Sequence, residues 1–166
     1  MIKQEIEDAV NRQINKEFSA AYVYLGMAAY FETINLAGFS HWCVMQHQEE
    51  ILHAMRLYRY LQDRGGKVVL EAIEKPRQDY QSPQEVFQTS LSQEQENTRA
   101  IDDLYELASK LNDHATISHL QWFLDEQVEE EKMVSEHLSL IKMAGSDANA
   151  IFYLNDKLGS RTAGED

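Results

Sequence analysis

Six polar residues interrupt the apolar stripes of four long helical segments in this sequence. They are Glu17, Glu50, His53, Glu94, Gln127 and Glu130. Burying an ionised carboxylate is unfavourable unless the group is paired or binds a metal. Several glutamates at the centres of apolar stripes therefore indicate a shared cation site.

The spacing of these residues repeats between the two halves of the chain. Glu17 and Glu50 are 33 residues apart, and so are Glu94 and Gln127. An offset of 77 residues relates the halves: 17 to 94, 50 to 127, 53 to 130, and beside them 49 to 126. This register is what two similar helical hairpins around one shared site require.

Glu50 and His53 form a Glu-x-x-His motif, which places both side chains on one helical face. The motif alone is weak evidence. Its combination with a central glutamate on the other segments matches the ligand pattern of di-iron carboxylate bundles. Oxygen donors with one imidazole suit iron, and the single cysteine, Cys43, excludes a thiolate cluster. So many acidic ligands would be unusual for structural zinc.

Composition limits the possible partners. The 166 residues suffice for one domain, and 28 acidic against 15 basic residues give a net charge of −13. Such a surface repels nucleic acid and anionic membranes and attracts cations. No apolar run reaches the length of a membrane span, and a single cysteine fits a reducing cytoplasm. We expect a cytoplasmic protein without nucleic-acid or membrane partners.

Helix signals divide the single domain, residues 1–166, into five helices and one long connection. Gly38 is expected to break the first helix and Ser40 to cap the second. Gly65-Gly66 ends the second helix, and Ser82 with Glu85 forms a capping box at the third. The expected helices cover about residues 2–35, 40–65, 83–111, 114–144 and 147–158.

The weakly helical stretch 67–81 determines the topology. A 25-residue helix is roughly 38 Å long, and 15 extended residues reach up to about 50 Å. The linker can therefore span the whole bundle. We predict an all-α four-helix bundle of two antiparallel hairpins joined by an end-to-end crossover, with a short fifth helix.

With these residues in this order, the whole chain resembles the ferritin family, most closely the non-haem ferritins of bacteria and archaea. The resemblance implies a first iron held by Glu17, Glu50 and His53. Glu50 would bridge to a second iron held also by Glu94 and Glu130.

The resemblance also implies roles around these two irons. Gln127 would hydrogen-bond bound oxygen or water, and Tyr24 would be a tyrosine beside the site that can donate an electron. A third, weaker iron would be held by four glutamates: Glu49, Glu126, Glu129 and Glu130.

Departures from related families narrow the resemblance. Bacterioferritins and rubrerythrin-like proteins carry a second Glu-x-x-His where this chain has Gln127 and Glu130. Bacterioferritins place a haem-ligating methionine where this chain has Ile51, so no haem is expected. The fifth helix argues against the small twelve-subunit relatives. Its face at residues 151–154 is expected to pack against other subunits of a 24-subunit cage.

Three functions remain open on the sequence. The first is a ferroxidase that oxidises Fe²⁺ with O₂ or H₂O₂ and stores the product as ferric mineral. The second is a di-iron oxygenase or peroxidase without storage. The third is a purely structural bundle whose central carboxylates are merely paired.

Overall fold

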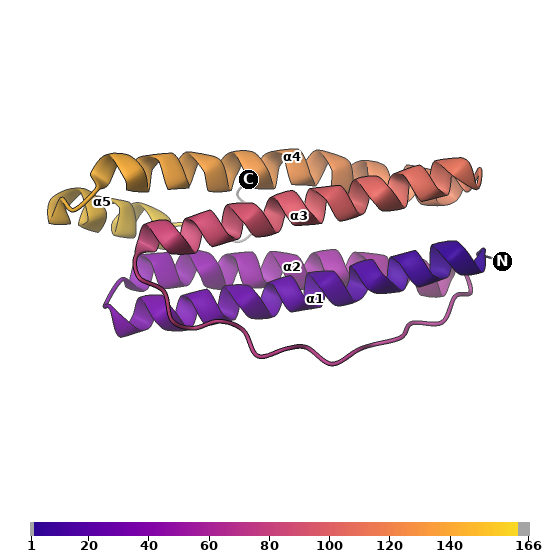
Figure 1. The fold of residues 1–166 in the computed structure, drawn as a ribbon, viewed down its shortest axis with the longest axis horizontal. Helices are drawn as coiled ribbons and strands as arrows, with labels where there is room; N and C mark the ends of the chain where they lie inside the picture. The colour runs from indigo at the N-terminus through magenta and orange to yellow at the C-terminus, as the bar shows by residue number, and fades with distance from the viewer. Residues whose placement is uncertain (1, 163–166) are drawn as a thin grey trace.

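The structure, a computed structural model, describes residues 2–162 and contains five helices in that range (Figure 1). The ends of the predicted domain, residues 1 and 163–166, lie outside the described part. The helices are α1 (Gln4–Thr33), α2 (Ala37–Asp63), α3 (Pro83–Lys110), α4 (His114–Ala144) and α5 (Ala148–Gly159).

The four long helices form two antiparallel hairpins. Helix α1 packs chiefly on α2, and α3 packs chiefly on α4. The connection between α2 and α3 runs the length of the bundle outside α1 (Figure 1). The expected all-α bundle with an end-to-end crossover is confirmed.

The corner between α1 and α2 differs from the sequence prediction. The chain turns at Asn35, whose φ of 57° is left-handed, and α2 already begins at Ala37. Gly38 and Ser40 therefore lie inside the helix, so the predicted break and cap were wrong. Gly38 is needed for close packing instead: a Cβ there would lie 1.7 Å from the carbonyl oxygen of Asn155.

The other predicted helix ends are close to the observed ones. After α2 the chain turns through Gly65 with a φ of 73°. At the start of α3, the hydroxyl of Ser82 accepts the backbone N–H of Glu85 at 3.2 Å. The Glu85 carboxylate accepts the N–H of Gln81, one residue earlier than a capping box requires.

Two asparagines of α1 hold the crossover in place. Asn11 donates to the carbonyl of Lys67 and accepts from the N–H of Val69. Asn15 repeats the pattern one turn later, with the carbonyl of Val69 and the N–H of Glu71. These side-chain amides satisfy an extended backbone that has no strand beside it.

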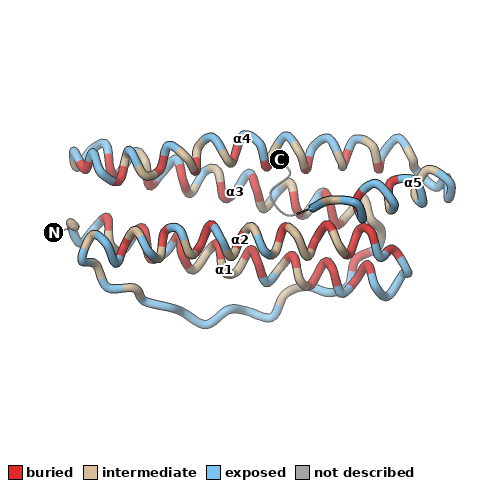
Figure 2. Tube along the Cα trace, turned by 180° about the vertical axis from the view of Figure 1, so that it is seen from behind, coloured by how far each residue is buried: buried red, intermediate tan, exposed pale blue. Residues whose placement is uncertain are grey.

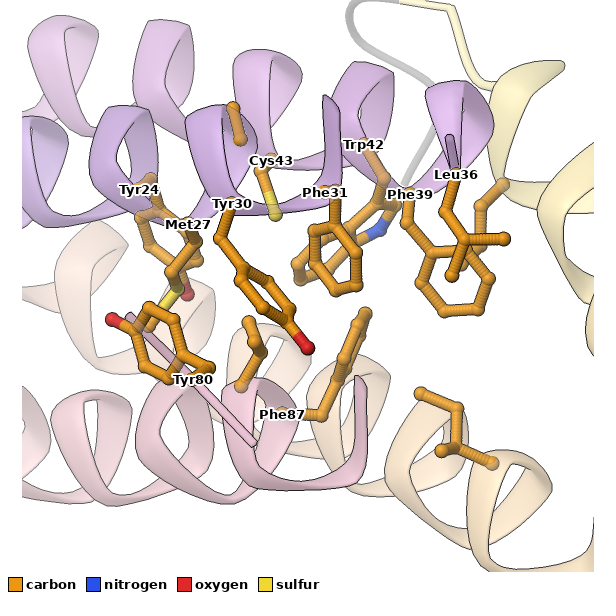
Figure 3. Close-up of a cluster of buried hydrophobic side chains, with 14 of the residues drawn as sticks. Tyr24, Met27, Tyr30, Phe31, Leu36, Phe39, Trp42, Cys43, Tyr80 and Phe87 are labelled. Carbon is orange, nitrogen blue, oxygen red and sulfur yellow. The ribbon is translucent and has the colours of Figure 1, made fainter. Parts of the chain in front are cut away.

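The buried core consists of two apolar clusters at opposite ends of the bundle. The first includes Tyr24, Phe31, Trp42 and Phe87 and is shown in Figure 3. The second includes Ile14 and residues nearer the other end of each long helix. Buried positions follow the inward face of every long helix, while the crossover is largely exposed (Figure 2). The six polar residues named above lie between the two clusters.

Helix α5 packs on α2 and α4 at one end of the bundle. Leu154 and Leu158 are buried within this chain, which corrects the expectation that the whole face 151–154 is free for other subunits. Phe152 and Tyr153 are exposed. Within residues 2–162, no helix is both long and apolar enough to cross a membrane.

Candidate metal centre

The six polar residues singled out in the sequence lie in one buried layer that crosses all four long helices. Each of the six is at most 3% exposed. They come from α1 (Glu17), α2 (Glu50, His53), α3 (Glu94) and α4 (Gln127, Glu130). The two apolar clusters above and below this layer exclude water from it.

Two groups of side chains in this layer have the geometry of a metal site. Ligand atoms of Glu17, Glu50 and His53 lie within 4.8 Å of one another, and so do those of His53, Glu126 and Glu130. His53 belongs to both groups because its ring lies between two carboxylates. Its Nδ1 is 3.7 Å from Glu50 and its Nε2 is 3.8 Å from Glu126.

Glu50 has a buried carboxylate oxygen that lacks a hydrogen-bond partner in the part of the chain that the structure describes. Its side chain is 1% exposed, and its Oε2 has no hydrogen-bond partner among the described residues. The contact to His53 at 3.7 Å is too long for a hydrogen bond. An orphaned buried carboxylate oxygen is unfavourable, so this atom is placed to bind a cation.

Glu94 lies in the same layer but is held by its neighbours. Its Oε1 accepts the hydroxyl of Tyr24 at 2.5 Å, and its Oε2 lies 3.5 Å from the amide nitrogen of Gln127. The Tyr24 hydroxyl is also 2.7 Å from that of Ser90. Neither of the two groups formed by the described residues includes Glu94. The structure thus places Tyr24, Glu94 and Gln127 together beside the two groups.

The four residues expected around a third iron do not form one cluster. Glu126 contacts His53, and the Oε2 of Glu130 accepts the amide of Gln46 at 2.9 Å. Glu49 is paired with Arg161 at 2.8 Å, and Glu129 is exposed. The third iron position stays a prediction.

Burial and mutual repulsion change the acidity of these groups. Burial, with repulsion from Glu94, raises the pKa of Glu50 well above its ordinary value. Burial also raises the pKa of Glu94 to about 7 and, with repulsion from Glu94, that of Glu130 to about 8. Burial opposes the charge on His53, but Glu126 and Glu50 raise its pKa to about 11. The metal-free layer therefore retains protons that a bound cation must displace.

Buried amides orient the carboxylate of Glu17. Gln13 donates to Glu17 at 2.7 Å and to Asn97 at 2.6 Å. Asn97 in turn donates to Glu17 at 3.2 Å and to the amide oxygen of Gln127 at 3.3 Å. Such outer partners fix the orientation of metal ligands.

The sequence reading assigned no role to these outer residues, although spacing could have found some of them. Gln13 lies four residues before Glu17, Gln46 four before Glu50, and Asn97 three after Glu94. At these distances side chains share a helical face. An amide side chain one helical turn from an expected ligand, on the same face, would have indicated a residue that orients that ligand. No such local signal exists for Arg161, which reaches the layer from beyond α5.

This arrangement has close counterparts among known proteins. The family model for the ferritin-like domain matches residues 7–144. The chain belongs to the ferritin family. It is 42% identical over 166 residues to the bacterial non-haem ferritin of Staphylococcus aureus, covering all of both chains. The Staphylococcus saprophyticus counterpart is 39% identical over 165 residues, covering 99% of each chain.

Solved ferritin structures share the fold of this ferritin-family chain. An Archaeoglobus fulgidus ferritin engineered into a closed form superposes with a TM-score of 0.96 at 40% identity, covering 98% of this chain and 99% of that one. The open-pore ferritin of the same archaeon also gives 0.96 at 40% identity, covering 97% and 98%. The expected fold and the resemblance to non-haem ferritins are confirmed.

Proposed function

We propose that this ferritin-family protein oxidises Fe²⁺ at the buried polar layer and stores the ferric product as mineral. The observation that carries this proposal is Glu50: a buried carboxylate with an orphaned oxygen, beside Glu17 and His53. Paired carboxylates alone would leave no such atom, so a purely structural layer fits less well.

The ligand assignment follows the two groups. Glu17, Glu50 and His53 bind the first Fe²⁺, supported by their separation of less than 4.8 Å. Glu50 bridges to a second Fe²⁺ bound by Glu130 and Glu94. The Oε2 of Glu94, which is 3.5 Å from the amide of Gln127, would bind this ion while its Oε1 keeps the hydrogen bond with Tyr24. The two ring nitrogens of His53 face different carboxylates, so Nδ1 beside Glu50 can bind the first ion while the Nε2 side faces Glu126.

The chemistry is a transfer of electrons from the substrate. Two Fe²⁺ ions bound side by side each give one electron to O₂ or H₂O₂, and carboxylates favour the resulting Fe³⁺ over Fe²⁺. The protein residues hold the two ions apart at a fixed distance. Gln127, whose amide reaches Glu94 and Thr98, is placed to hydrogen-bond oxygen or water. The contact with Glu94 supports an electron-donor role for Tyr24, in which oxygen would receive a further electron and Glu94 the phenol proton.

Storage requires an assembly of subunits that encloses a cavity, and this chain has apolar surface to build one. Five large apolar side chains are more than half exposed on the helices: Leu52, Val128, Met143, Phe152 and Tyr153. A contiguous exposed apolar patch marks a protein contact, and Met143 and Tyr153 line one hollow between α4 and α5. A 24-subunit homo-oligomer would cover them. With Ile51 after Glu50 no haem ligand is expected, and the free, buried Cys43 fits a cytoplasmic location.

One experiment separates this function from the alternatives. The protein is loaded aerobically with Fe²⁺, and its mass by size exclusion is measured together with the iron retained per chain. A cage of 24 chains that retains many irons per chain supports storage. A small oligomer with two irons per chain would instead indicate a di-iron oxygenase or peroxidase, and an iron-free protein would indicate a structural bundle.

A further inference from the structure

Arg161 lies against the middle of α2, far along the chain from its partners. It follows α5, which packs on α2 and α4 and directs the chain back along the bundle (Figure 1). Its carbonyl oxygen is 2.8 Å from Nε2 of His41, and its guanidinium lies 5.7 Å from the ring centre of Trp42. The Arg161 side chain is only 8% exposed. The Arg161 side chain is therefore largely buried against α2.

The guanidinium binds two groups on α2, one and two turns beyond Trp42. One nitrogen donates to both carboxylate oxygens of Glu49, at 3.0 and 2.8 Å. Another donates to the amide oxygen of Gln46. The amide nitrogen of Gln46 donates to Glu130 at 2.9 Å. Arg161 thus contacts Glu49 directly and reaches Glu130 through one side chain.

Glu49 and Glu130 are two of the four carboxylates expected to bind a third iron. The guanidinium of Arg161 already satisfies both oxygens of Glu49, a carboxylate that a third cation would also need. Two positive charges beside one carboxylate, the guanidinium and a third cation, would repel each other strongly where water is largely excluded. Glu49 can therefore neutralise either Arg161 or a third cation.

We propose that Arg161 is a built-in competitor for the third cation site. While it is paired with Glu49, Gln46 holds Glu130 toward the second iron position, and the protein binds two cations per chain tightly. A third cation binds Glu49 only when Arg161 leaves. This inference rests on the proposed function, because it concerns the use of the same carboxylates.

The test is cation binding to the assembled protein, measured by titration calorimetry with anaerobic Fe²⁺ and with redox-silent Zn²⁺. In Arg161→Ala and Arg161→Gln, a third cation per chain should bind about tenfold more tightly than in the wild type, the effect of one charge-assisted hydrogen bond. The two tight sites should persist. Lys157→Ala removes a charge from exposed α5 surface and is the matched control, with wild-type binding expected.

A double substitution tests the route through Glu49. In a Glu49→Gln background, replacing Arg161 should give no gain at the third site, because its competitor role requires that carboxylate. Unchanged third-site affinity in both Arg161 variants would overturn the inference. Absence of the two tight sites in the wild type would instead overturn the proposed function.

A crystal structure of the wild-type protein soaked in Zn²⁺ gives a test without any substitution. Arg161 on Glu49 and a third ion on Glu49 should never occur together in one subunit. A third ion bound to Glu49 with Arg161 still in place would contradict the proposal.

Discussion

Tyr24 donates its hydroxyl hydrogen to Glu94 over 2.5 Å, and this contact joins the first helix of one hairpin to the first helix of the other. Burial and the negative charge of Glu94 raise the pKa of Tyr24 well above its ordinary value, so the phenol keeps its proton. The neutral phenol orients the carboxylate proposed as a ligand of the second iron.

Tyr24→Phe should weaken binding of the second Fe²⁺ about tenfold, the usual loss when an outer partner of a metal ligand is removed. Binding of the first Fe²⁺ should change little, because Glu17, Glu50 and His53 do not contact this hydroxyl. Anaerobic titration followed by stopped-flow oxidation measures both. Tyr30→Phe is the control, since Tyr30 belongs to the same apolar cluster but is not in the polar layer. Equal binding in the two variants would contradict this role.

Asn97→Leu should weaken the first site by about 10- to 100-fold, again as the loss of an outer partner. Asn97 donates to Glu17 and accepts from Gln13, so the substitution removes one hydrogen-bond partner from each of these two side chains. Calorimetric Zn²⁺ titration measures the effect. Gln88→Ala, on the exposed face of the same helix, should bind as the wild type does. A wild-type first site in Asn97→Leu would show that Glu17 needs no such orientation.

Cation binding should release protons and tighten as the pH rises. Glu94 and Glu130 have pKa values of about 7 and about 8, so both are largely protonated at pH 6 and must ionise to bind a metal. Glu94 is largely ionised by pH 8, whereas Glu130 still retains about half of its proton there. Zn²⁺ affinity should therefore fall between pH 8 and pH 6, while more protons are released per ion. Calorimetry in buffers of different ionisation enthalpy counts these protons, and pH-independent binding would rule out this linkage.

Glu50→Gln should stabilise the metal-free protein at pH 8. The folded pKa of Glu50 is raised, so the protonated form favours folding and ionisation destabilises the fold as the pH rises above the ordinary glutamate value. Glutamine cannot ionise, and the gain should be ~1–3 kcal/mol, because each tenfold change in proton affinity between the folded and unfolded states is worth about 1.4 kcal/mol. Denaturant unfolding should show the gain at pH 8 and a smaller one at pH 5. Glu136→Gln, on the exposed surface, should show none, and a less stable Glu50→Gln would contradict the electrostatic account.

The fold was predictable because helix periodicity and turn residues are local signals. The crossover followed from the length of 67–81, and the capping serine at 82 was correctly identified. The corner after α1 was not predictable in the same way. Its left-handed residue is Asn35, whereas the glycine at position 38 is the residue type that most often adopts this conformation. Gly38 is required by contact with Asn155, a residue 117 positions away. Sequence periodicity carries no information on such contacts.

The polar layer was predictable for a similar reason: its glutamates repeat at fixed offsets on apolar stripes. The structure adds which neighbours already occupy each carboxylate. Tyr24 binds Glu94, and Arg161 binds Glu49. The second pairing depends on the path of the chain after α5, which no helix pattern encodes. Long-range placement of a single side chain is thus the part that sequence reasoning missed.

The central claim is that the buried layer around Glu50 oxidises Fe²⁺. The most direct test is stopped-flow ferric absorbance after mixing with two Fe²⁺ per chain in aerobic buffer, for the wild type, Glu50→Ala and His53→Ala. The account predicts a fast phase in the wild type that both variants lose, while all three elute at the same assembled mass. A fast phase of wild-type rate in either correctly assembled variant would contradict it.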